Sequence, residues 1–97
     1  MEQAVRALQQ AAIQTNLYEA ALRKGNSRDG NREGTLAGLW GAAASDFYRL
    51  DPELAERLQL KAEYWTDPDA WTSEQIMSAR ISLQQITELT RQVLREG

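Results

Sequence analysis

Apolar residues recur every three or four positions along most of the chain, and this spacing constrains its fold more than any other feature. Such a period places these side chains on one face of an α-helix, whereas a half-buried strand would need strict alternation. The pattern is interrupted three times, by a glycine-rich stretch, by Asp51-Pro52 and by the sequence TDPDAW. We therefore expect four helices, over about residues 2–24, 35–50, 52–66 and 73–95, and no strand.

Local signals mark most of the expected helix ends. Gly25 follows Arg23 and Lys24, an order typical of a helix C-terminus. Thr35 is expected to cap the second helix. The third helix is expected to begin at Asp51-Pro52, a capping residue followed by a proline at the first helical position.

The fourth helix has the clearest expected start. Thr72 and Gln75 have the spacing of a capping box, in which each side chain accepts a hydrogen bond from the other residue's backbone N–H. Trp71 and Ile76 flank this box at the positions of a hydrophobic staple.

The apolar faces of the four segments supply enough residues for one core. The simplest packing is a small antiparallel four-helix bundle, in which the short middle helices pack across the long outer ones. We thus expect an all-α fold with the order long, short, short, long, forming a single helical domain over residues 1–97. The expected core residues are Ala4, Val5, Leu8, Ala11, Ala12, Thr15, Tyr18, Leu22, Leu36, Leu39, Trp40, Ala43, Phe47, Leu50, Leu54, Leu58, Ala62, Trp65, Ile76, Ala79, Leu83, Ile86, Leu89, Val93 and Leu94.

The stretch GNSRDGNREGT, from Gly25 to Thr35, raises the question of a phosphate-binding loop. Two of its glycines are five residues apart, as in a P-loop, but Asn31 and Arg32 replace the Lys and Ser/Thr that bind phosphate and magnesium. A helix also precedes it, where the motif requires a strand. We expect a flexible connector over residues 25–34, and leave open an arginine-bearing loop that orders on an anionic partner.

The residue types present in the chain give little support to a catalytic function. The chain contains no cysteine and no histidine, which excludes thiolate metal sites and the commonest general base. The pairs Glu53/Glu56 and Glu63/Asp67 resemble those that hold magnesium in all-α nucleotide pyrophosphohydrolases, but the second pair is spaced by four and lies on the same helix. We expect no enzymatic activity, no cofactor and no metal.

Charge and hydropathy bear on location and partners. No apolar run approaches the ~20 residues that cross a bilayer, and the N-terminus lacks the order of a signal peptide. We expect a cytoplasmic protein with no membrane association. Residues 35–72 carry seven acids against three bases, a net −4, so we expect no direct binding to nucleic acid. This acidic segment supports one alternative function, an inhibitor or regulator of a nucleic-acid-binding protein that imitates its phosphates.

Apolar pairs off the expected core faces favour a different function. Ile13/Leu17, Leu60/Tyr64 and Met77/Ile81 each have i, i+4 spacing, so each pair would form a contiguous patch. The first helix also carries no charge from Ala7 through Tyr18, as is typical of an interface core. We expect a protein–protein interaction or oligomerisation module, in a homo-oligomer or a hetero-complex. Its candidate interface is Ile13, Leu17, Leu60, Tyr64, Trp71, Met77 and Ile81; the alternative is that a wide core buries these pairs.

Overall fold

The computed structural model describes residues 2–96. Over these residues the chain forms five α-helices and one short 3-10 turn, and no strand, so the expected all-α class is confirmed. The elements are α1 (Glu2–Arg23), α2 (Gly30–Phe47), α3 (Pro52–Thr66), η1 (Pro68–Ala70), α4 (Ser73–Ala79) and α5 (Leu83–Glu96).

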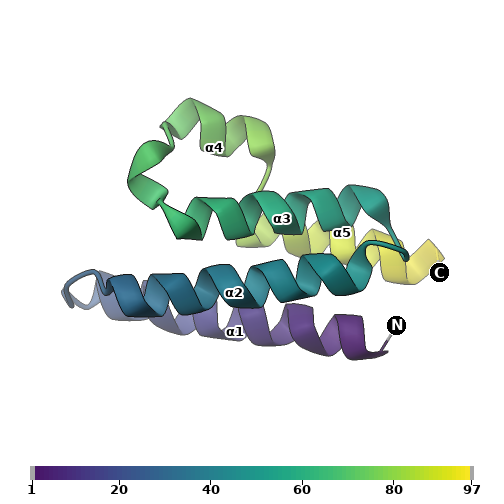
Figure 1. The fold of residues 1–97 in the computed structure, drawn as a ribbon, viewed down its shortest axis with the longest axis horizontal. Coiled ribbons are helices and arrows are strands. Elements are labelled where there is room, and N and C mark those ends of the chain that lie inside the picture. The colour runs from purple at the N-terminus through teal and green to yellow at the C-terminus, as the bar shows by residue number, and fades with distance from the viewer. Residues whose placement is uncertain (1, 97) are drawn as a thin grey trace.

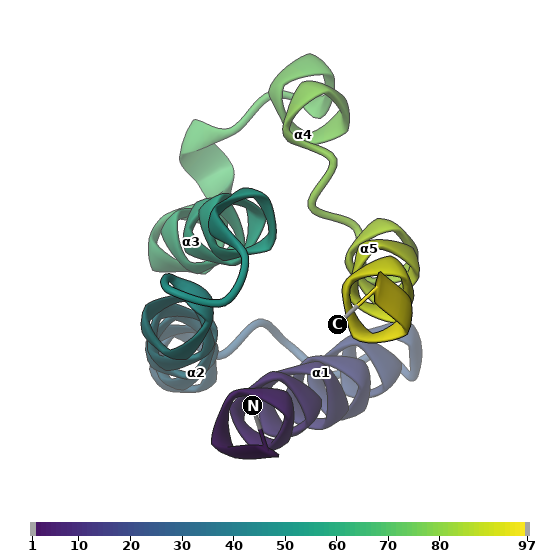
Figure 2. The ribbon, with the colours of Figure 1, turned by 90° about the vertical axis from the view of Figure 1, so that its right-hand side faces the viewer.

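The helices are arranged around a shared interior. In Figure 1, α1, α2 and α3 lie one above another, and each runs opposite to the one before it. Viewed from the side in Figure 2, α5 stands across from α2 and α3, close to α1, while α4 lies farthest from α1. The outer surface of α1 therefore lies on the opposite side of the molecule from α4.

The core contains most of the residues that the sequence pattern predicted. Trp40 and Phe47 of α2 and Leu54 and Leu58 of α3 are completely buried. Leu50 and Leu94 were expected in the core, but each is 43% exposed. Leu50 lies beyond the end of α2, where the chain already turns toward α3, and Leu94 lies in the last turn of α5.

Two consecutive hydrogen bonds link three buried residues in this core. The indole N–H of Trp40 donates to the hydroxyl oxygen of Thr15 over 2.9 Å, and that hydroxyl donates to the carbonyl oxygen of Ala11 over 2.7 Å. All three residues are fully buried. A buried polar group without a partner is costly, so this chain of bonds allows a tryptophan side chain to fill the space between α1 and α2.

The second helix begins five residues before its expected start. Asp29 accepts hydrogen bonds from the backbone N–H groups of Asn31 and Arg32, so that α2 begins at Gly30. Thr35 is not a cap; its hydroxyl donates to the carbonyl of Asn31 within the helix. Asp is at least as good a capping residue as Thr. The glycines at positions 25, 30 and 34 suggested a loop instead of a helix start there.

The expected fourth helix is two helices. Arg80 adopts a left-handed conformation with φ of 55°, which ends α4, and α5 begins after Ser82. The hydroxyl oxygen of Ser82 accepts a bond from the backbone N–H of Gln85 over 3.1 Å. A left-handed residue costs about 1–2 kcal/mol. The break carries Ile81 into the core, where it is 1% exposed, and burial of such a side chain contributes about 1.5–3 kcal/mol.

The predicted capping box of α4 is confirmed. The hydroxyl oxygen of Thr72 accepts from the N–H of Gln75 over 3.1 Å, and the Gln75 side chain accepts from the N–H of Thr72 over 2.8 Å. Trp71 and Ile76 are both half-buried against the core, while a direct staple contact between them stays a prediction.

Loss of this cap should loosen α4. Thr72→Ala should lower the free energy of unfolding by on the order of 1 kcal/mol, because it leaves the first N–H groups of α4 without a partner. Chemical denaturation and hydrogen exchange of the α4 amides measure the effect. Ser78→Ala, which removes an exposed hydroxyl within the same helix, is the matched control; an equal loss in both variants would contradict a capping role.

Candidate functional site

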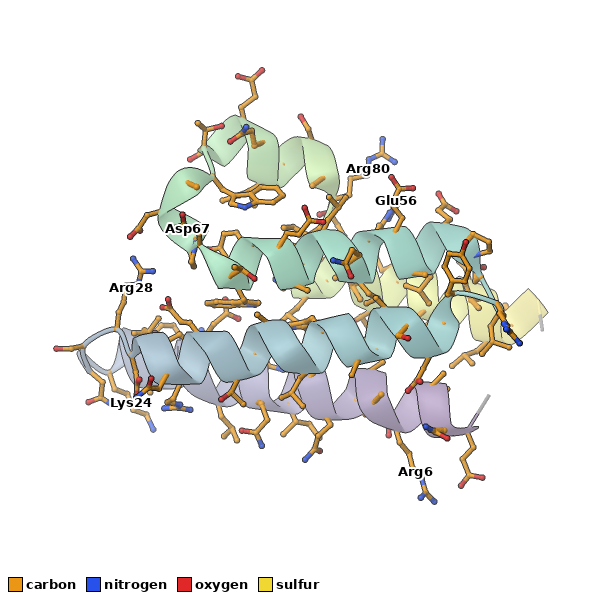
Figure 3. The ribbon with its side chains drawn as sticks, viewed as in Figure 1. Arg6, Lys24, Arg28, Glu56, Asp67 and Arg80 are labelled. Carbon is orange, nitrogen blue, oxygen red and sulfur yellow. The ribbon has the colours of Figure 1, made fainter. Side chains whose placement is uncertain are left out.

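The outer surface of α1 holds the clearest exposed apolar pair. Ile13 is 52% exposed and Leu17 is 55% exposed, and they lie one helical turn apart. Exposed polar side chains without charge surround them: Gln9, Gln10 and Asn16. In Figure 3, Arg6 and Lys24, near the two ends of the helix, both project away from the other helices. We call this surface, made of Gln9, Gln10, Ile13, Asn16 and Leu17, the α1 face.

A groove between α1 and α2 continues the α1 face. It has a volume of about 540 Å³, and Ile13 forms part of its wall. Leu39 and Ala42 of α2 line the other side. The rim of the groove is polar and includes the charged residues Arg6 and Asp46. Ile13 thus connects the exposed pair on α1 to a groove of mixed character beside α2.

The other candidate interface residues lie elsewhere. Leu60, Tyr64 and Trp71 are half-buried against the core, and the Tyr64 ring stands edge-on to that of Trp71 with 6.0 Å between their centroids. Met77 is 74% exposed on α4. Ile81 was expected on an outer face, which is wrong, because the break between α4 and α5 turns it inward. The candidate residues thus do not form one surface: the α1 pair and Met77 are exposed, the other three are half-buried, and Ile81 is buried.

The stretch from Gly25 to Thr35 is exposed apart from the buried Glu33, but its residues from Gly30 onward belong to α2 and not to a connector. The flexibility of residues 25–29 stays a prediction, although side-chain contacts anchor this segment. Two Arg28 N–H groups donate to the two oxygens of Glu33, each over 3.0 Å, and a third N–H group donates to Asp69 over 2.6 Å. The buried hydroxyl of Tyr18 donates to Glu33 over 2.6 Å and accepts from the backbone N–H of Asp29 over 2.9 Å. These contacts tie the start of α2 to α1 and to the η1 turn.

The electrostatics of this cluster follow from its contacts. Hydrogen bonds from Arg28 lower the pKa of Glu33, and burial together with the bond to Glu33 raises the pKa of Tyr18. The guanidinium of Arg32 lies over the Tyr18 ring, 5.0 Å from its centroid. Because Arg28 already binds two carboxylates, the alternative of an arginine-bearing loop that awaits an anion loses its main donor.

The acidic segment is partly used by the fold. Asp51 caps α3, Glu53 pairs with Arg57 over 3.5 Å and Asp69 pairs with Arg28. The remaining acids include three that line a groove of about 1010 Å³ between α2 and α3: Asp46, Glu56 and Glu63. Arg49 and the small residues Gly41 and Ala44 line the same groove, so its charge is mixed.

Sequence reasoning missed a buried lysine between α2 and α3. Lys61 is 6% exposed, and the ring centroids of Trp40, Tyr64 and Trp65 lie 5.9, 5.7 and 5.9 Å from its Nζ atom. Burial lowers the pKa of Lys61, an effect that the charge of Glu19 opposes. The indole N–H of Trp65 is also buried and has no hydrogen-bond partner within residues 2–96. The only sequence signal was a lysine beside the apolar face of the third helix.

Comparison with known proteins adds no further assignment. No protein-family model, curated protein or solved structure gives a significant match to this chain. Among the residues described, no group of three or more acidic side chains is arranged to hold a metal ion. Over the same residues, none of the helices combines the length and apolar character that crossing a membrane requires.

Proposed function

We propose that this protein is a small non-enzymatic helical module that self-associates through the α1 face. The observation that carries the proposal is the pair Ile13 and Leu17, which stand more than half exposed at the centre of an uncharged helix surface. Single exposed aliphatic residues are ordinary on a protein surface. A contiguous aliphatic pair bordered by uncharged amides is typical of the core of an interface.

Charge complementarity favours a second copy of this chain as the partner. Glu2 and Lys24 are each eleven positions from Ile13, and at 100° per residue both fall within about 20° of it around the helix axis. An antiparallel pair of α1 helices centred on Ile13 would place Glu2 of one copy opposite Lys24 of the other. Glu2 and Lys24 would then meet at both ends, where Glu2 already pairs with Arg6 of its own helix over 2.7 Å and would be shared between the two cations. The uncharged centre would meet itself, as a two-fold symmetric interface requires.

The size of the apolar pair predicts a weak dimer. Burying the exposed half of each aliphatic side chain contributes about 1–1.5 kcal/mol, or about 4–6 kcal/mol for the four side chains of a dimer. Association costs an estimated 4–15 kcal/mol. The neighbouring groove at Leu39 and Ala42 must therefore contribute, and the expected dissociation constant lies in the micromolar to millimolar range.

A charge at the centre of the α1 face tests the proposal. Leu17→Glu should abolish self-association, because the carboxylate would either be desolvated in the interface or hold the two copies apart. Sedimentation velocity of the variant and the wild type at matched concentrations measures this effect. Leu50→Glu is the matched control, since Leu50 is also exposed but lies at the α2–α3 junction; it should associate like the wild type.

Folding of the variants must be checked by circular dichroism. A folded Leu17→Glu protein that associates as strongly as the wild type contradicts the proposal. Equal weakening by Leu17→Glu and Leu50→Glu would place the interface elsewhere and contradict it as well.

The acidic regulator of a nucleic-acid-binding protein stays the second proposal, and salt distinguishes the two. Contacts through apolar side chains should persist at raised ionic strength, whereas imitation of phosphates should weaken steeply. The structural roles of Asp51, Glu53 and Asp69 leave fewer acids for such imitation. A cytoplasmic location, expected from the sequence, is compatible with either function.

A further inference from the structure

Lys61 is the one lysine of the chain that lies in the interior. The other lysine, Lys24, follows the end of α1 and is exposed. An ammonium group in the interior normally has an acidic partner, because removing a charge from water is expensive. Lys61 instead has three aromatic rings around it and feels the charge of Glu19 without an ion pair to it, and Nζ makes no hydrogen bond among the residues described.

The aromatic rings compensate for burial only in part. Their centroids lie close to 6 Å from Nζ, near the outer limit at which a ring attracts a cation. Burial accordingly favours the neutral amine and lowers the pKa of Lys61 below its usual value of 10.5. A neutral amine is a nucleophile, which the ammonium form is not.

The lysine also borders open space. A cavity of about 210 Å³ lies beside it, with walls from α1, α3, α4 and α5 and from the link between the last two helices. Its other lining residues are Glu19, Tyr64, Ile76, Ile81, Ser82 and Leu83. The cavity therefore combines one amine, one carboxylate and an aliphatic wall. It is smaller than the roughly 300–1,000 Å³ typical of sites for drug-sized ligands.

We propose that Lys61 and this cavity form a covalent binding site for a small apolar aldehyde, held as an imine on Nζ. This site goes beyond self-association through the α1 face, and it uses neither Ile13 nor Leu17. The size and the aliphatic wall of Ile76, Ile81 and Leu83 select a short alkyl chain or a single ring.

The chemistry balances without any further reactant. The lone pair of the neutral Lys61 amine attacks the carbonyl carbon and forms a C–N bond, while the carbonyl π electrons move to oxygen. Proton transfer from nitrogen to oxygen gives a carbinolamine. Loss of its hydroxyl group as water, with loss of the remaining N–H proton, leaves a C=N bond. Glu19, which lines the same cavity, is placed to accept the nitrogen proton and to protonate the departing hydroxyl group.

Reductive trapping of the full-length protein tests this site. The protein is incubated at neutral pH with benzaldehyde and sodium cyanoborohydride, which reduces an imine to a stable benzylamine, and the labelled positions are mapped by peptide mass spectrometry. Lys24 is the internal control, because it is exposed and does not line the cavity. We expect Lys61 to be labelled severalfold faster than Lys24, because burial lowers the pKa of Lys61 and so raises its fraction of neutral amine, and because the cavity holds the ring beside it.

Two further measurements test whether faster labelling of Lys61 depends on the folded cavity. In denaturant, Lys61 and Lys24 should be labelled at equal rates, because the cavity is lost. Lys61→Arg, which keeps the charge but cannot form the imine, should leave Lys24 labelled at its wild-type rate. If Lys61 in the native protein is labelled no faster than Lys24, or if its advantage persists in denaturant, the proposal is wrong.

Discussion

Replacement of residues 25–34 by a Gly/Ser linker of equal length should destabilise the protein severely. The replacement removes the Asp29 cap, whose loss costs about 1 kcal/mol, together with the buried Glu33 and its Arg28 partner. Arg28 is half exposed, so solvent screens part of its attraction to Glu33. The loss of these contacts should add to the loss of the cap, so we expect chemical denaturation to show a total loss clearly larger than the roughly 1 kcal/mol of the cap alone.

Single substitutions locate the source of this loss. Ser27→Ala, at an exposed position just before the cluster, should leave the denaturation midpoint unchanged. Glu33→Gln should account for much of the loss, because an amide can neither pair with Arg28 nor accept the same charged hydrogen bonds. If the linker protein is as stable as the wild type, the cluster contributes nothing and the stretch is a connector after all.

The Glu33 carboxylate should make the stability of the protein fall at acid pH. The pKa of Glu33 in the folded protein is lowered from its usual value of 4.5, so the folded state favours the ionised form. Its contribution is therefore complete above about pH 4.5 and disappears as the pH falls through the lower folded value. Glu33→Gln should remove this part of the pH dependence, and an identical acid profile in both proteins would contradict it.

Trp40→Ala should also have a large effect. Trp40 is completely buried, and truncation of such a residue typically costs about 3–5 kcal/mol through lost burial and the cavity that remains. The substitution also leaves the Thr15 hydroxyl without its donor and removes one of the rings beside Lys61. Thermal and chemical unfolding with circular dichroism measure the loss.

Trp71→Ala is the matched control for this prediction. It removes the same side chain from a half-buried position against the core, so it should cost clearly less than Trp40→Ala. Equal losses would mean that the interior around Trp40 closes over the missing ring, and would contradict its place at the centre of the core.

Much of this fold follows from the spacing of apolar residues. The positions of α1 and α3 were predicted to within a residue or two, because each has an apolar stripe of regular period and a clear stop or start at Gly25 or Asp51. The capping box at Thr72 was also predictable, because it depends only on two residues three positions apart, Thr72 and Gln75.

The errors arose where long-range contacts determine local structure. The glycines around Asp29 suggested a loop, but burial of Glu33 against Tyr18 and Arg28 stabilises a helix there. The sequence from Thr72 onward is compatible with one helix, and burial of Ile81 stabilises the left-handed residue that interrupts it. Tyr18 lies 15 residues before Glu33 in the sequence, so the local pattern around Asp29 did not reveal this contact.

The sites differ in how far the sequence revealed them. The pair on α1 was predicted from helical spacing, because the positions of Ile13 and Leu17 on one face depend on α1 alone. The buried environment of Lys61 was not, since it requires rings from α2 and α3 and a cavity wall from α4 and α5. Side chains from separate helices meet there only in the folded protein.

The mass of the wild-type protein in solution tests self-association most directly. Light scattering at increasing concentration should show a mass that rises from the 11.0 kDa of one chain toward twice that value. Leu17→Glu should stay at the mass of one chain over the same range. A wild-type protein that remains at 11.0 kDa up to millimolar concentration would contradict self-association through the α1 face.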